Sequence, residues 1–164
     1  MGAGKTTVGK LLAARLGRPF ADTDAILEAR AGMTIAEIFA REGEAAFRER
    51  ERALIGELAE YRGHVLALGG RMLFGEANVE AIRRTALTIW LRASPETLAA
   101  RLTPEAIASR PVLAGEGDVE DRIAALLAER TSWYARAHLA FDTDRLTPAE
   151  VAETIARAIG APCA

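Results

Sequence analysis

Apolar residues are spaced in two different ways along this chain. Between residues 8 and 16, one valine and three leucines recur at the spacing of a single helical face, and Gly17 follows as a helix stop. Continuous apolar runs at 64–68 and 86–91 are instead typical of strands buried on both faces. Shorter strands are predicted at 19–24 and 139–142. Strands separated by helices predict an α/β fold, a three-layer sandwich in which helices flank a mainly parallel sheet.

Capping residues mark several helix starts. Thr34-Ile35-Ala36-Glu37 and Thr147-Pro148-Ala149-Glu150 are capping boxes, and Ser94-Pro95 supplies a hydroxyl cap with a proline in the first turn. The first box predicts a short helix that Gly43 ends. The other predicted helices cover 25–30, 47–58, 119–129 and 147–160, and one more helix starts at 95.

The first seven residues, Met1-Gly-Ala-Gly-Lys-Thr-Thr7, are typical of the second half of a phosphate-binding loop that continues into a helix. Two glycines at alternate positions let successive N–H groups point inward, and the helix dipole is directed at the same place. Lys5 would reach the β- and γ-phosphates, and the Thr6 hydroxyl is where such loops ligate Mg²⁺. The alternative interpretation is that these residues are only a glycine-rich start of a helix and bind no phosphate. The predicted nucleotide-binding residues are Gly2, Ala3, Gly4, Lys5, Thr6 and Thr7.

A phosphate-binding loop normally follows a buried parallel strand. We therefore expect such a strand, with its lead-in of roughly ten to fifteen residues in all, upstream of Met1. The fold expected for this chain is then of the P-loop kinase type with its first strand missing. An apolar strand ending in glycine, read in frame just before Met1, would support this expectation.

Two carboxylates end the strand predicted at 19–24. Ligands gather beyond the carboxyl ends of parallel strands, so Asp22 and Asp24 are expected to face the nucleotide, and residues two apart in extended chain point the same way. The alternative is that Asp24 merely caps the helix at 25–30.

Three later segments contain further candidate residues. Arg48 lies beside an apolar helix face, where a solvated pair with Glu51 is the simpler explanation. Gly69-Gly70 permit close approach of backbone to a ligand, or form a plain turn. Residues 103–117 lose apolar periodicity and contain Arg110, which suits either a mobile lid that places a cation over phosphates or an ordinary surface loop.

The composition limits the kinds of partner that the protein is expected to bind. The 164 residues predict one domain, and the net charge of −2 gives no basis for binding nucleic acid or an anionic membrane. No apolar run approaches the length of a membrane span. Cys163 is the sole cysteine, which excludes a disulfide within one chain and favours the cytoplasm. A monomer is expected.

Together these motifs resemble those of shikimate kinase, a nucleoside-monophosphate-kinase-like P-loop family, over essentially the whole chain. Their order and spacing carry the resemblance, because each fragment is weak alone. The matching segments are residues 1–7, Asp22-Thr-Asp24, 32–39, 43–48, Gly69-Gly70, 110–115 and Arg130-Thr-Ser-Trp-Tyr134.

The resemblance implies Mg²⁺-dependent transfer of the γ-phosphoryl group of ATP to the 3-hydroxyl of shikimate, a small carboxylated cyclohexene triol. By similarity, Asp24 binds the acceptor hydroxyl and accepts its proton, and Asp22 lies near the metal that Thr6 ligates. Arg48 and Arg130 hold the substrate carboxylate, for which a guanidinium fork is the better cation. The remaining implied contacts are Lys5 and Arg110 to the phosphates, Gly69 and Gly70 to the ring hydroxyls, and Arg101 near adenine.

The chain departs from the family at Arg71, which stands where the third of three consecutive glycines is usual. Its side chain could swing outward, add a contact to an anionic substrate, or obstruct shikimate. The outward position is the favoured interpretation, because the side chain can leave while the backbone amide stays.

Two other functions stay open from the sequence. One is a noncatalytic, shikimate-kinase-like domain that senses a ligand. The retained Lys5, Asp24, Arg48 and Arg130 argue against it, whereas Arg71 and the missing first strand argue for it. The other is a kinase for another hydroxylated acid such as gluconate, for which the pair Arg48 and Arg130 is the discriminating feature and a panel of acceptor acids is the test.

Overall fold

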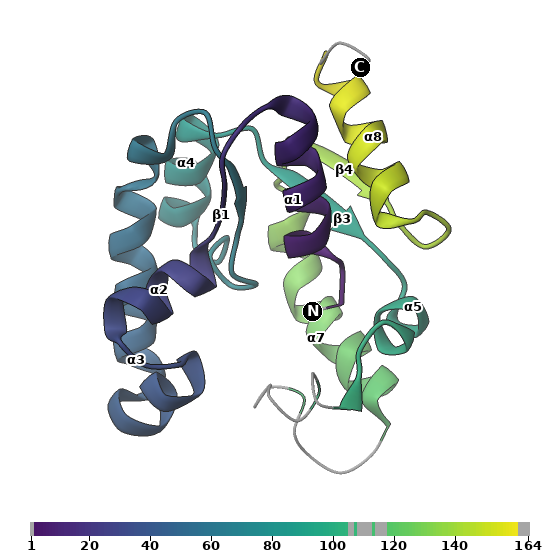
Figure 1. Cartoon of the computed structure of the whole chain (residues 1–164). Coiled ribbons are helices and arrows are strands. Elements are labelled where there is room, and N and C mark those ends of the chain that lie inside the picture. The colour runs from purple at the N-terminus through teal and green to yellow at the C-terminus, as the bar shows by residue number, and fades with distance from the viewer. Residues whose placement is uncertain (1, 105–106, 108–112, 114–117, 161–164) are drawn as a thin grey trace.

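The computed structural model describes residues 2–104, 107, 113 and 118–160. Figure 1 shows two groups of elements side by side, with β1, α2, α3 and α4 in one and α1, β3, β4, α5, α7 and α8 in the other. The elements in chain order are α1 (Lys5–Leu16), β1 (Phe20–Asp22), α2 (Thr23–Ala31), α3 (Ile35–Gly56), η1 (Leu58–Tyr61), β2 (Val65–Ala67), α4 (Glu76–Thr85), β3 (Ile89–Arg92), α5 (Pro95–Ala100), α7 (Val119–Tyr134), β4 (Leu139–Asp142) and α8 (Pro148–Ala158).

The strands pair in parallel, which confirms the α/β prediction. β1 pairs with β2 in the register Phe20↔Val65 to Asp22↔Ala67, and β3 pairs with β4 from Ile89↔Leu139 onward. Within the described residues these strands form two separate two-stranded sheets rather than one continuous sheet. An apolar cavity of about 400 Å³ lies where β2 and β3 face each other, lined by both strands and by α1. The expected strand upstream of the loop stays a prediction.

Local capping chemistry sets the helix boundaries. Both predicted capping boxes are present, and the Ser94 hydroxyl accepts a hydrogen bond from the backbone N–H of Thr97 at 3.2 Å. The predicted break between two helices at Gly43 is confirmed. Helix α3 spans Ile35–Gly56, but Gly43 within it is non-helical, with φ 84° and ψ 170°, and the two helical stretches meet there at a kink.

The strand predicted at 19–24 is shorter than expected. It ends at Asp22, because the Asp22 side chain accepts a hydrogen bond from the Asp24 backbone N–H at 3.0 Å and thereby caps α2. Asp24 therefore neither extends the strand nor caps the helix. It lies in the first turn of α2, on the same edge as the end of β1.

Three apolar clusters hold the elements together. One packs α2, α3, η1 and α4 around Ile38 and Leu54, and another joins α1 to α8. The third joins α5 to α7 through Leu98 and Ile123, with the fully buried Leu113 between them. Leu113 belongs to the predicted lid, so at least this residue packs against the domain. No helix in the described ranges is long and apolar enough to cross a bilayer.

A single buried hydroxyl connects the start of α2 to the end of β2. Thr23 is fully buried, and its Oγ1 donates to the Ala67 carbonyl at 3.2 Å and accepts from the Gly69 N–H at 2.8 Å. This side chain fixes the position of the Gly69-Gly70 segment relative to α2. Loss of the hydroxyl would leave the Gly69 N–H buried without its acceptor.

The substitution Thr23→Val should therefore lower the free energy of unfolding by about 1–3 kcal/mol, measured by urea denaturation. Thr154→Val is the matched control, because Thr154 is exposed on α8 and its hydroxyl bonds only to the Glu150 carbonyl within that helix. The control should change the free energy by less than about 0.5 kcal/mol. Equal losses in the two variants would contradict the role given to Thr23.

Candidate active site

The loop before α1 takes the conformation predicted for a phosphate-binding turn. Gly2 and Gly4 have left-handed φ angles of 63° and 77°, and a Cβ at Gly2 would lie 2.8 Å from the Leu98 carbonyl oxygen. The Gly4 carbonyl accepts from the Val8 N–H at 2.8 Å as α1 begins. Other N–H groups in the first helical turn have no carbonyl within the helix to bind, so this helix start is suited to an anion.

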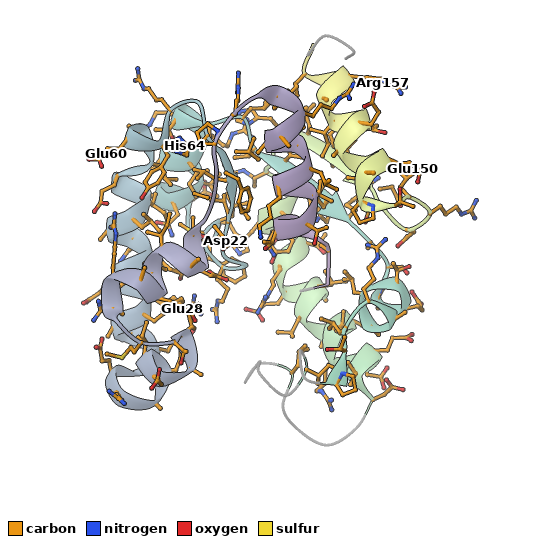
Figure 2. The ribbon with its side chains drawn as sticks, in the orientation of Figure 1. Asp22, Glu28, Glu60, His64, Glu150 and Arg157 are labelled. Carbon is orange, nitrogen blue, oxygen red and sulfur yellow. The ribbon has the colours of Figure 1, made fainter. Side chains whose placement is uncertain are left out.

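Thr6 and Asp22 come together beside this loop. The Thr6 hydroxyl donates to Asp22 Oδ2 at 2.7 Å, and Figure 2 shows Asp22 at the end of β1, near the start of α1. Both groups offer oxygen ligands, which Mg²⁺ prefers. In the described part of the chain, histidine, cysteine and carboxylate side chains nowhere gather in a group of three or more that could hold a metal. A Mg²⁺ ion here would therefore need oxygens from phosphate and water as well.

Asp24 lies against Gly69. A Cβ built on Gly69 would be 2.7 Å from Asp24 Oδ1 and 3.1 Å from Glu51 Oε1, so only glycine leaves room for the two carboxylates. Burial raises the pKa of Asp24, and the negative charge of Asp22 raises it further. Lys5 and Arg48 act in the opposite direction through their positive charges. Asp24 is thus a half-buried carboxyl within the electrostatic reach of two predicted site cations.

Arg48 forms the predicted pair with Glu51, but the pair is not solvated. Arg48 Nη1 lies 2.5 Å from Glu51 Oε2, and Glu51 is only 4 % exposed. Burial raises the pKa of Glu51, while the hydrogen bond from Arg48 opposes the rise. The other edge of the guanidinium, Nε and Nη2, donates to Glu44 Oε1 at 3.1 and 2.9 Å. Arg48 is therefore held in place by a buried carboxylate on one side and a surface carboxylate on the other.

Arg130 is the second predicted guanidinium, and it is 6 % exposed. Its buried Nε has no hydrogen-bond partner among the described residues. A Cβ on Gly70 would lie 3.4 Å from Arg130 Nη1, and the Tyr134 hydroxyl donates to the Gly70 carbonyl at 2.7 Å. Gly70 therefore lies against Arg130 and Tyr134, while its neighbour Gly69 lies against Asp24.

The backbone of Gly69-Gly70 is more engaged than the sequence indicated. The Gly69 N–H donates to Thr23, the Gly69 carbonyl accepts from the Met72 N–H at 3.2 Å, and the Gly70 carbonyl accepts from Tyr134. The predicted contacts to ring hydroxyls would thus use the Gly70 N–H or the second lone pair of a carbonyl.

Two hollows are lined by predicted site residues. The cavity of about 400 Å³ is lined by Lys5, Gly69, Gly70 and Arg130 among others, and a surface groove of about 630 Å³ is lined by Thr6, Asp22 and Asp24. Gly69 lines the cavity and lies against Asp24, which lines the groove.

The Arg71 side chain contacts two half-exposed carboxylates and an aromatic ring. Its Nη1 lies 3.1 Å from Glu44 Oε1, its Nη2 lies 3.9 Å from Glu129 Oε1, and its guanidinium lies 4.9 Å from the Phe74 ring centre. The side chain, 34 % exposed, therefore joins the rim of the site next to Arg48.

Three other predicted residues are not placed at the phosphates by described contacts. Arg101 donates to the hydroxyl and carbonyl of Thr143 at 3.1 and 2.5 Å, which ties the end of α5 to the loop after β4. Thr7 is exposed in the first turn of α1. Arg110 lies outside the described residues.

Sequence reasoning gave no role to three residues that shape the site. Thr23 positions Gly69, Tyr134 holds the Gly70 carbonyl, and Glu44 binds Arg48. The signal for Glu44 was its spacing of four residues from Arg48 on one helix. Nothing in the spacing of Thr23 or Tyr134 indicated partners 46 and 64 positions away along the chain.

The structure thus brings together, in an α/β protein, a glycine turn at a helix start, a hydroxyl beside a carboxylate, and a half-buried aspartate close to Arg48. The model of the shikimate kinase family ("SKI: Shikimate kinase") matches residues 1–160. The chain therefore belongs to the shikimate kinase family.

Individual relatives agree with the family match. The chain is 47 % identical to a shikimate kinase of Symbiobacterium thermophilum, over 94 % of this chain and 89 % of the relative. It is 44 % identical to a shikimate kinase of Moorella thermoacetica, over 98 % of this chain and 91 % of the relative. A solved shikimate kinase of Acinetobacter baumannii in complex with shikimate superposes with a TM-score of 0.89 at 36 % identity, covering 97 % of this chain and 88 % of that one.

The raised pKa of Asp24 gives a prediction about stability. The folded-state pKa of Asp24 lies above the ordinary 3.8, so ionisation of this carboxyl opposes folding. Replacing the carboxyl with a neutral group should therefore stabilise the folded protein at neutral pH. Asp24→Asn should raise the free energy of unfolding at pH 7. The gain should shrink as the pH falls through the folded-state pKa and vanish below about 3.8.

Urea denaturation at a series of pH values measures this dependence. Glu49→Gln serves as control, because Glu49 is exposed on α3. A gain for Asp24→Asn that is the same at pH 3 and pH 7, or a loss at pH 7, would show that burial does not dominate the ionisation of Asp24.

Proposed function

We propose that this chain, a shikimate kinase by family, transfers the γ-phosphoryl group of ATP to the 3-hydroxyl of shikimate at the place where Lys5, Asp24, Arg48 and Arg130 converge. The single observation that supports this assignment is the contact between Asp24 and Gly69, which brings the carboxylate on α2 next to the segment packed on Arg130. Phosphoryl transfer needs positioning and charge neutralisation more than covalent chemistry, and the site offers both.

The substrate carboxylate is assigned to Arg48 and Arg130. The buried Glu51 fixes Arg48 on one edge, and Arg130 presents a buried guanidinium whose Nε has no described partner. A bound carboxylate that reaches the Arg130 guanidinium would offset the cost of burying its charge. The two guanidiniums would thereby orient the ring so that one hydroxyl faces Asp24.

Asp24 is assigned to the acceptor hydroxyl. Its pKa is raised by burial, which makes the carboxylate a better proton acceptor than an exposed aspartate. As the hydroxyl oxygen forms its bond to the γ-phosphorus, the bond from that phosphorus to the β–γ bridging oxygen breaks, and the hydroxyl proton passes to Asp24. Lys5 and the N–H groups of the loop would neutralise the charge that develops on the phosphates.

The oxygen donors of Thr6 and Asp22 suit Mg²⁺, which would neutralise phosphate charge when bound with ATP. Thr6 would hold the ion directly, and Asp22, which accepts from Thr6, would orient that hydroxyl and bind the ion through water. Gly2, Ala3, Gly4 and Thr7 complete the proposed ATP site.

Several finer assignments rest on the sequence and on the family. They are a single domain with a lid at 103–117, Arg110 over the phosphates, Arg101 near adenine, a monomeric state without nucleic acid or membrane partners, and a cytoplasmic location. The family match and the relatives support neither the noncatalytic sensor nor the gluconate kinase.

A coupled assay of ADP release tests the reaction. With ATP and Mg²⁺, we expect turnover with shikimate and none above background with gluconate, because only a rigid ring acid satisfies both guanidiniums and Asp24. ADP release with gluconate at a comparable kcat/KM, or with no acceptor at all, would contradict the assignment.

The role of Arg48 gives a sharper prediction. Arg48→Lys keeps the charge beside Glu51 but loses the fork, so KM for shikimate should rise about tenfold, roughly 1.4 kcal/mol, with kcat within about threefold. KM for shikimate methyl ester, which lacks the carboxylate charge, should change less than about twofold. Arg41→Lys is the control, because Arg41 is exposed on the same helix and pairs with Glu37. An equal rise for acid and ester would contradict a carboxylate contact at Arg48.

A further inference from the structure

One carboxylate oxygen at the rim of the site is shared by two guanidiniums. Glu44 Oε1 accepts from Arg48 Nε and Nη2 at 3.1 and 2.9 Å, and it lies 3.1 Å from Arg71 Nη1. Glu44 is half-exposed, and its hydrogen bonds from Arg48 lower its pKa, so it is ionised at neutral pH. Arg71 and Arg48 therefore both bind the same anion.

The edge of Arg48 that Glu44 occupies is the one a substrate would need. Glu51 binds Nη1 at 2.5 Å from the buried side. Nε and Nη2 form the edge of the fork that binds a carboxylate with two parallel hydrogen bonds. Glu44 therefore occupies, in the structure, the proposed position of the substrate carboxylate, and the two anions cannot hold that edge together.

Arg71 is placed to resolve this competition. It already contacts the same oxygen of Glu44, and its guanidinium is held between the Phe74 ring at 4.9 Å and Glu129 at 3.9 Å. Rotation of the Glu44 side chain toward Arg71 would free the edge of Arg48 without leaving the Glu44 charge unpaired. Removal of Arg71 would leave Glu44 with Arg48 as its sole described cation partner.

We propose that Arg71 is a positioning residue that takes Glu44 from Arg48 when the carboxylate of the substrate binds, and so favours acceptors that carry a carboxylate. This inference rests on the proposed function, because it assumes that Arg48 binds the substrate carboxylate. Arg71 itself acts through Glu44 and does not contact the substrate.

A double-mutant cycle tests the proposal in the coupled assay. Arg71→Gln should raise KM for shikimate about threefold or more and leave kcat within twofold, because Glu44 then stays on Arg48. Glu44→Gln should lower KM or leave it unchanged, since the competing charge is gone. In the Glu44→Gln background, Arg71→Gln should change KM by less than about 1.5-fold.

Two controls separate this effect from general electrostatics. Arg136→Gln removes an exposed arginine that pairs with Glu76 at 2.7 Å, and it should not change KM. KM for shikimate methyl ester should be insensitive to Arg71→Gln in either background. Thermal unfolding of each variant verifies that the native fold is retained.

Other outcomes would overturn the proposal. The same rise in KM with Glu44 present or absent would mean that Arg71 acts on the substrate directly, and no rise in either background would mean that it has no role in binding. Failure of the proposed function can be told apart from failure of this inference, because an unchanged KM for shikimate in Arg48→Lys would indicate the former. If KM rises in Arg48→Lys but the effects of Arg71→Gln and Glu44→Gln on KM are additive, the proposed function stands. Only the proposal that Arg71 acts through Glu44 is then rejected.

Discussion

The parallel pairing of β1 with β2 is the constraint on which the site depends. The register Asp22↔Ala67 brings the carboxyl ends of both strands to one edge, where α2 begins and Gly69-Gly70 follows. Thr23 fixes that arrangement with one buried hydroxyl, and Asp24 then contacts Gly69. A shift of one residue in the register would turn Asp22 and its neighbours to the opposite face and separate Asp24 from the Arg130 side.

Charge burial is the second organising feature. Glu51 is almost inaccessible, Arg130 is 6 % exposed, and Asp24 is half-buried, so three ionisable groups lie where a globular core would place apolar residues. Such groups are costly unless they are paired, and Arg48 and Glu51 neutralise each other directly. In the proposed function, the carboxylate and a hydroxyl of the substrate would bind Arg130 and Asp24.

Features set by neighbours in the chain could be predicted from the sequence. Both capping boxes, the Ser94 cap, the last strand and the glycine turn before Lys5 are as expected, because each depends on residues within a few positions. Helix α4 was missed, since its N-cap residue, Gly75, offers no side-chain cap and the helix buries only Val79 and Ile82. The break between β2 and β3 was also not predictable, because strand order depends on contacts between distant segments.

The difference between contacts of chain neighbours and contacts of distant segments also decides what could be predicted within the site. The sequence singled out Asp24, but its contact with Gly69 depends on tertiary packing, as do the contacts of Arg71 with Glu44 and Glu129. A crystal structure of the protein with shikimate and ADP tests the central claim most directly. We predict the carboxylate of shikimate within hydrogen-bond distance of Arg48 and Arg130, and its 3-hydroxyl next to Asp24. Shikimate bound with its carboxylate away from both guanidiniums, or with Asp24 remote from every hydroxyl, would contradict it.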